Sequence, residues 1–438
     1  MLGWLGAALL SSVIGLCQYF GLAHYFSPWM SVAEPGEAFA NLRQRNHFAS
    51  LTNIGVAALL WWLRDRWMRG VSGKYTLAAS YLGLVLLVAG NAASISRVGF
   101  IQLLLLVVLA GAWKGPHQLR LFKTALFGLV AYVLAAVVLP ILLERFLGIA
   151  AGNAFSRMAQ QEGCWSRRAL WSNVLHLIAQ KPWLGWGWGE LDYAHYATLY
   201  PGERFCALLD NAHNLPLHLA VELGIPLAAI ICGGLFWAAV AAAPWRATQP
   251  EHQLAWMILV VILLHSMVEY PLWYGPFQIA AGLAVLFLLP LRSDSAIRAA
   301  MAVRLPAAAL VAACVLYALW DYSRVGQIYR PYEERSAYYR DDTLAKLQGS
   351  WLFRSQVLFA ELSVTPLTPA NAPHMVNLAR DLLHFSPEQR VIEVLIEALT
   401  MTQKYEEALW HAARYRAAYP SDFAAWTEKN RLPLKLSP

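Results

Sequence analysis

Nine long apolar segments, separated by polar stretches, constrain the fold of this chain more than any other feature of its sequence. A segment needs roughly 17 to 25 mostly apolar residues to cross a hydrocarbon core of about 30 Å. The candidates are residues 2–25, 47–63, 75–93, 98–113, 121–143, 214–241, 253–270, 273–291 and 303–320. Because 58% of the 438 residues are hydrophobic and only 14% are charged, the sequence predicts an all-α polytopic membrane bundle of about nine helices.

Basic residues in the short loops predict how this bundle is oriented, since cytoplasmic loops carry an excess of Lys and Arg. The loops at 64–74, 114–123 and 292–304 are basic, which places them and the N-terminus inside. Residues 26–46, 94–97, 144–213, 270–273 and everything after 320 then lie outside, on the periplasmic side of a bacterial inner membrane. This topology explains the net charge of +7. The basic residues form no stripe with interleaved aromatics, so nucleic acid is not an expected partner.

The pattern divides the chain into four parts. We predict five membrane helices in residues 1–143, a long periplasmic loop in 144–213, four more membrane helices in 214–320 and a water-soluble helical domain in 321–438. The loop contains an amphipathic helix over 168–181. An aromatic turn at Pro182–Gly189 ends this helix. The last domain shows helical stretches near 341–361, 371–384, 387–401 and 404–418, with Pro420 as a stop, and its final pair resembles a tetratricopeptide hairpin.

The five cysteines form no CxxC pair and no Cys/His cluster, so the sequence predicts neither a metal site nor a redox motif. Cys164 and Cys206 both lie in the long loop. They are able to form a disulfide if that loop faces an oxidising compartment, and the sequence leaves open whether they do.

Polar residues gather at the outer ends of the predicted helices. The first group runs from Asn41 to His47 and the second from Ser94 to Arg97. A solvated loop explains the first group, and an Arg that extends to the lipid headgroups explains the second. However, arginines on the outer face run against the positive-inside bias, and an anionic partner outside would explain them.

Arg167 and Arg168 in the long loop, with Arg157 before them, form the third group. The planar guanidinium donates two parallel hydrogen bonds to phosphate oxygens, which suits a diphosphate. Attraction to anionic lipid headgroups explains these residues equally well.

The fourth group, Asp210–Ile225, is the most specific, because a polar cluster leads directly into a membrane helix that Gly224 interrupts. Helix capping explains Asp210 and Asn211 but not His213 and Asn214 at the edge of the bilayer. A His at this position can accept a proton from an alcohol.

The fifth group, His265–Tyr274, spans the next outer turn. We expect His265 and Glu269 to share one helix face because they are four residues apart. A buried structural pair beside an aromatic belt is the alternative, which we favour for His265 but not for Glu269.

In these motifs, the chain resembles the bacterial pilin-type O-linked oligosaccharyltransferases, within the superfamily of O-antigen ligases and Wzy polymerases. The features that carry the resemblance are Gln44-Arg-Asn46, Ser96-Arg97, Arg168 with Pro182-Trp-Leu-Gly-Trp-Gly187, His213-Asn214 and His265–Tyr274. The resemblance implies a GT-C-like membrane fold with further membrane helices before the segment that opens this chain. We therefore expect that the sequence lacks an N-terminal portion or starts at an internal Met.

The resemblance implies transfer of a preassembled glycan from undecaprenyl diphosphate to a hydroxyl of a periplasmic protein such as a pilin. The essential residue would be His213, as general base in an inverting, metal-independent reaction that needs no cofactor. Glu269 and Asn214 would assist it. The expected substrate-binding residues are Gln44, Arg45, Asn46, Arg97, Arg167, Arg168 and Tyr274.

Other readings of the sequence remain. Within the same superfamily, an O-antigen ligase would use the lipid A core as acceptor, and a Wzy-type enzyme would polymerise the glycan. A flippase would need polar residues at the bilayer midplane and internal repeats, which the sequence lacks. A structural scaffold would leave the Arg and His residues on one outer face unexplained.

Overall fold

Helices make up both parts of the protein. The computed structural model describes residues 2–71, 73–149, 163–289 and 294–430, and no strand occurs among them. The all-α prediction is therefore confirmed. The chain divides into two compact units, described separately here: unit 1 holds Met1–Gly163, Ala212–Leu219 and Pro226–Pro290, and unit 2 holds Cys164–Asn211, Ala220–Ile225 and Leu291–Pro438. Arg157 lies outside the described residues.

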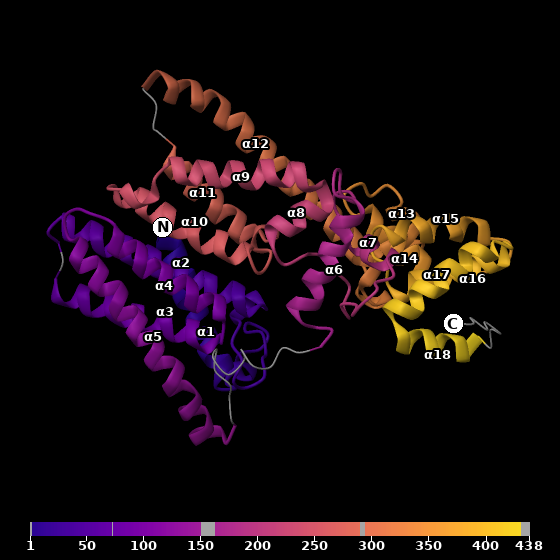
Figure 1. Cartoon of the computed structure of the whole chain (residues 1–438), viewed down its shortest axis with the longest axis horizontal. Helices are drawn as coiled ribbons and strands as arrows, with labels where there is room; N and C mark the ends of the chain where they lie inside the picture. The colour runs from indigo at the N-terminus through magenta and orange to yellow at the C-terminus, as the bar shows by residue number, and fades with distance from the viewer. Residues whose placement is uncertain (1, 72, 150–162, 290–293, 431–438) are drawn as a thin grey trace. The chain divides into compact units, whose positions relative to one another are not determined.

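Long apolar helices form unit 1 (Figure 1). They are α1 (Leu2–Tyr19), α2 (Arg45–Met68), α3 (Lys74–Ala93), α4 (Arg97–Ala112), α5 (Gln118–Leu147), most of α9 (Ile225–Ala241), α10 (Pro250–Ser266) and α11 (Gly275–Leu288). By length and composition, five described helices are able to cross a membrane: Leu2–Tyr19, Lys74–Ala93, Gln118–Leu147, Ile225–Arg246 and Pro306–Tyr329. Helices α4 and α11 are apolar but shorter. Because several described helices are long and apolar enough to span a bilayer, the chain is a multi-pass membrane protein. The count of nine spans stays a prediction.

A buried polar network joins α2 to its neighbours. The Gln102 amide donates to Ser50 Oγ at 2.8 Å, and the Asn53 amide donates to Gln102 Oε1 at 3.0 Å. The Asn91 amide donates to Asn53 Oδ1 at 3.0 Å, and Ser50 Oγ is 2.9 Å from His265 Nδ1. Polar groups buried among apolar helices need such partners. The network therefore fixes α2, α3, α4 and α10 against one another, close to the helix ends that form the site described below.

The predicted span 214–241 is interrupted at Gly224, as the sequence indicates. Helix α8 (Leu215–Leu223) ends there and α9 begins at Ile225. Gly224 has φ +82°, and the segment Pro182–Gly187 lies directly against it. Backbone hydrogen bonds fix this contact: Ile225 N–H donates to Pro182 O at 2.8 Å, and Gly187 N–H donates to Glu222 O at 3.0 Å. The aromatic turn therefore satisfies backbone groups at the break.

Unit 2 contains the loop helices and the C-terminal helices. These are α6 (Arg167–Gln180), α7 (Leu191–Ala197), α12 (Asp294–Val325), α13 (Thr343–Leu347), α14 (Arg354–Val364), α15 (Ala372–Leu383), α16 (Gln389–Met401), α17 (Tyr405–Ala418) and α18 (Pro420–Asn430). The apolar faces of α15, α16, α17 and α18 pack into one core. The prediction of the amphipathic helix at 168–181 is confirmed by α6. The tetratricopeptide resemblance stays a prediction.

One expectation about these helices was wrong. The stretch 341–361 is not one helix, because a turn separates α13 from α14. The Ser350 hydroxyl in that turn donates to the buried Asp321 carboxylate at 2.9 Å. The predicted stop at Pro420 is confirmed, because α17 ends at Ala418, and Pro420 then opens a further helix, α18. The first position of a helix needs no N–H donor and suits the fixed φ of proline.

The structure pairs Cys164 with Cys206, whose Cα atoms lie 5.4 Å apart. This answers the question that the sequence left open. The bridge joins residues 42 positions apart, and in the chain-entropy model closing a loop of that length stabilises the fold by about 4 kcal/mol. The disulfide therefore holds the start of α6 to the end of the loop that follows α7.

Candidate functional site

Two of the side chains expected to be catalytic meet in unit 1. His213 Nδ1 lies 2.7 Å from Glu269 Oε2, and the side chains are 21% and 10% exposed. An ionised carboxylate only accepts hydrogen bonds, so this contact favours the imidazole tautomer that carries a proton on Nδ1. A buried carboxylate that orients an imidazole in this way prepares Nε2 to accept a proton.

Backbone geometry presents His213. It adopts φ +50°, a left-handed conformation that is uncommon for residues other than glycine and clusters at functional sites. The next residue, Asn214, holds the turn in place. Its Oδ1 accepts from Leu217 N–H at 3.0 Å and so caps α8, while its amide donates to Met267 O at 2.9 Å. Asn214 is therefore placed to fix the turn that carries His213 beside the turn that carries Glu269.

Asn46 connects this pair to two other helices. Its amide donates to Glu269 Oε1 at 3.4 Å, and its Oδ1 accepts from Ser96 Oγ at 2.7 Å. Ser96 also caps α4 by accepting from Gly99 N–H at 3.0 Å, and Ile95 before it adopts φ +53°. The ends of α2, α4 and α10 thus converge on the Glu269 carboxylate, and the site is built where sequence segments far apart meet.

Aromatic rings surround the His213 imidazole and the end of α2. Tyr270 contacts His213 edge to face, with ring centroids 4.9 Å apart, and stacks on Tyr274 at 5.9 Å. Tyr274 in turn meets the buried His47 at 4.1 Å. Sequence reasoning assigned no role to His47. Its position directly after Asn46 was the only signal that could have indicated one.

The expectation that His265 and Glu269 share a helix face was wrong. Helix α10 ends at Ser266, so Glu269 lies in the turn beyond it. His265 contacts Ser50 within the buried network, whereas Glu269 contacts His213. The turn separates a structural histidine from the carboxylate of the site.

The residues expected to bind substrate have different surroundings. Gln44 caps α2 by accepting from His47 N–H at 2.6 Å, and Arg45 forms an ion pair with Glu37 at 2.9 Å. Arg97 is exposed at the first position of α4. Arg167 and Arg168 begin α6 in unit 2, so their grouping with His213 stays a prediction. Among the described residues, no set of three or more His, Cys, Asp or Glu side chains is arranged to hold a metal ion.

The fold and the site define a class: a multi-pass helical membrane protein in which a histidine and a carboxylate meet at converging helix ends. Comparison with known families agrees with this class. The O-antigen ligase family matches residues 82–232, and the family of C-terminal domains of virulence factor membrane-bound polymerases matches residues 253–432. The protein glycosylation ligase family matches residues 38–63, a segment that includes Asn46 and the start of α2.

Two curated relatives come from Acinetobacter baylyi. A general O-oligosaccharyltransferase is 23% identical over 286 residues, which cover 63% of this chain and 47% of the relative. A ComP-specific O-oligosaccharyltransferase is 25% identical over 248 residues, covering 56% and 43% respectively. The matched region thus spans less than half of either relative. No solved structure matches the chain.

Three family models thus match separate segments of the chain, and they describe O-antigen ligases, protein glycosylation ligases and membrane-bound polymerases. Both curated relatives are O-oligosaccharyltransferases, so the chain is similar to O-oligosaccharyltransferases over the matched residues.

Proposed function

We propose that this chain transfers a preassembled glycan from undecaprenyl diphosphate to a Ser or Thr hydroxyl of a periplasmic protein, such as a pilin. The contact between His213 Nδ1 and Glu269, at 2.7 Å, carries the proposal. A hydroxyl is a weak nucleophile until a base takes its proton, and this contact gives the imidazole the tautomer that such a base requires.

In the proposed reaction, His213 Nε2 takes the proton of the acceptor hydroxyl while its oxygen attacks the anomeric carbon. The bond between that carbon and the diphosphate oxygen breaks, and undecaprenyl diphosphate leaves with the bonding electrons. This single displacement inverts the anomeric centre. Arginines, with Arg97 at the site end of α4 as the first candidate, would stabilise the charge on the diphosphate. Glu269 would stabilise the imidazolium that forms.

A periplasmic position for this chemistry rests on two observations. The Cys164–Cys206 disulfide is typical of proteins in an oxidising compartment. The basic loops at 64–74 and 114–123 are typical of cytoplasmic loops, and they lie at the ends of α2 and α4 opposite Asn46 and Ser96. Both observations favour a site that faces the periplasm.

An O-antigen ligase is the second candidate, because the O-antigen ligase family matches residues 82–232, which include His213. Its acceptor would be a hydroxyl of the lipid A core. The same base and the same diphosphate leaving group would serve both acceptors, so only the acceptor distinguishes the two functions.

The test is to express the chain in a bacterial host that supplies a lipid-linked glycan and a pilin, and to measure the pilin mass. We expect a glycan-sized mass increase for the wild type. His213→Ala should lower the transfer rate by about 10²- to 10⁴-fold at matched membrane abundance, since general-base catalysis contributes that much. His252→Ala is the matched control, because His252 lies in the first turn of α10, at the other end of that helix from Glu269.

Three outcomes would contradict parts of this proposal. Glycan on lipid A core instead of pilin would support the ligase. Equal transfer by wild type and His213→Ala would remove the proposed base. A product with the donor's anomeric configuration retained would exclude single displacement.

A further inference from the structure

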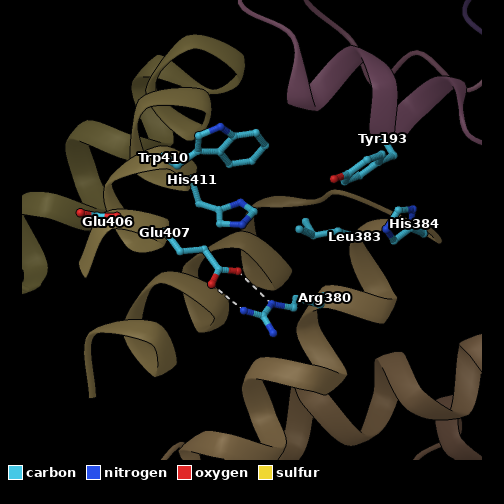
Figure 2. A pocket seen from close by; sticks show the side chains of 8 residues that line it. All are labelled: Tyr193, Arg380, Leu383, His384, Glu406, Glu407, Trp410 and His411. Carbon is cyan, nitrogen blue, oxygen red and sulfur yellow. Dashed lines mark hydrogen bonds and ion pairs between the residues drawn. The ribbon is translucent and has the colours of Figure 1, made fainter. Parts of the chain in front are cut away.

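A second polar site lies within unit 2, in an open pocket of about 540 Å³ between α7, α15 and α17. Figure 2 shows Trp410 and His411 on α17 opposite Tyr193 on α7, with the ion pair of Arg380 and Glu407 below them. A concave pocket of this volume, lined by aromatic rings and a few fixed polar groups, has the properties of a small-molecule site.

Aromatic rings form two walls of the pocket. Tyr193 lies against His384 with ring centroids 4.0 Å apart, and His384 Nδ1 is held by Glu190 Oε2 at 2.6 Å. On the other side Trp410 meets His411 edge to face at 4.7 Å. Rings fixed in this way offer flat apolar surfaces without loss of side-chain freedom on binding.

The floor of the pocket is polar and its charges are paired. Arg380 Nε donates to Glu407 Oε1 at 2.8 Å, and a second guanidinium nitrogen contacts Glu407 Oε2. This contact holds the pKa of Glu407 below its usual range, so the pair stays ionised. Burial lowers the pKa of His411 to about 4, and that imidazole is neutral at pH 7.

Arg414 holds the Trp410 ring in place. Its guanidinium lies over the Trp410 ring at 3.4 Å and donates to Ala197 O at 2.7 Å. At the floor, the Glu407 carboxylate is paired with the Arg380 guanidinium, and Glu406 is a further carboxylate of the lining. A phosphate or a cationic peptide side chain at this floor would have to break the ion pair between Arg380 and Glu407, so the pocket favours an uncharged ligand.

We infer that this pocket binds an uncharged saccharide. A pyranose ring has an apolar face of C–H groups that packs on an aromatic ring, and pairs of neighbouring hydroxyls that match the planar edges of a carboxylate or guanidinium. The walls and the floor supply these two kinds of contact together. This binding goes beyond the proposed transfer reaction and does not need the chemistry of His213. In the cell, the saccharide would come from the lipid-linked donor or from glycan already attached to an acceptor.

Saturation-transfer NMR on the full chain in lipid nanodiscs tests the inference, since glycoside detergents would compete for the pocket. The probes are methyl glycosides of glucose, galactose, rhamnose, N-acetylglucosamine and N-acetylgalactosamine, together with chitobiose. We expect saturable binding of at least one probe. Trp410→Ala should weaken it at least tenfold, and Glu407→Gln should weaken it while keeping the shape of the side chain. Trp351→Ala is the matched control, since Trp351 belongs to unit 2, is 77% exposed and lies outside the lining.

The same titration with His213→Ala separates this inference from the proposed function, because saccharide binding should persist in a variant that fails to transfer glycan. Absence of saturable binding by every probe would overturn the inference. Equal affinity of the wild type and Trp410→Ala would do so too. Binding of an acceptor-protein peptide that the saccharides do not displace would assign the pocket to a protein partner instead.

Discussion

At the scale of single residues, the site depends on contacts that no local pattern contains. His213, Glu269 and Asn46 were each identified because they are polar residues at the ends of apolar segments. The contact between Asn46 and Glu269 joins residues 223 positions apart, and sequence spacing carries no information about it. The sequence therefore indicated the members of the site, whereas the partner of each side chain required the fold.

A substitution of Asn46 tests whether this residue orients Glu269. Asn46→Ala removes the amide donor from Glu269 and the acceptor from Ser96, so the carboxylate loses an orienting contact. We expect the turnover of glycan transfer to fall by about 10- to 100-fold, since small misplacements of a catalytic group have effects of that size. The apparent KM for the acceptor should not change.

Transfer rates measured against acceptor concentration, at matched membrane abundance, check this prediction. Asn371→Ala, in unit 2, is the control for loss of a surface amide. A rise in KM at unchanged turnover would mean that Asn46 binds substrate, as the sequence analysis expected, instead of positioning Glu269.

At the scale of elements, helix bounds follow from periodicity and breaks follow from glycine and proline. The sequence predicted α6, α15, α16, α17 and the interruption at Gly224 because each has a local cause. The sequence did not predict the turn between α13 and α14, where Ser350 donates a hydrogen bond to the distant Asp321. It also did not predict α18. Elements with local signals were predictable, and those that depend on tertiary contacts were not.

Gly224→Ala tests the backbone contact at that interruption. The glycine has φ +82°, and an added Cβ would collide with the Trp183 carbonyl. We expect a loss of stability on the order of 2 kcal/mol, because both strain and steric overlap act at one position. Thermal unfolding of the purified chain checks it. Gly202→Ala, in the same unit and with open space around it, should change little, and equal melting temperatures for both variants would contradict the argument.

At the scale of the whole molecule, the sequence predicted the class of all-α membrane protein, since this class follows from composition along the chain. The sequence did not predict which titratable groups tertiary packing buries. The protonation of these groups makes the stability of the chain depend on pH. Burial lowers the pKa of His195 to about 3 and raises the pKa of Asp192 to about 7, with nearby carboxylates adding to the latter.

These two pKa shifts change the stability of the fold in opposite directions as the pH changes. His195 is neutral in the folded state, so its contribution to stability is complete above the unfolded pKa of about 6.5 and is lost as the pH falls toward 3. Asp192 is protonated in the folded state below about pH 7, whereas the unfolded chain ionises near pH 4. Its burial therefore lowers stability progressively as the pH rises from about 4 to 7.

Asp192→Asn isolates the second effect, because an amide keeps an oxygen that can accept from Tyr193 N–H and has no proton to lose. We expect the variant to exceed the wild type in stability by on the order of 2 kcal/mol at pH 8, with the difference shrinking toward zero near pH 4. Melting temperatures of both proteins across that range measure it. The acid loss due to His195 should remain in both. A difference that stays constant with pH would show that Asp192 is ionised in the folded protein and that burial does not hold its proton.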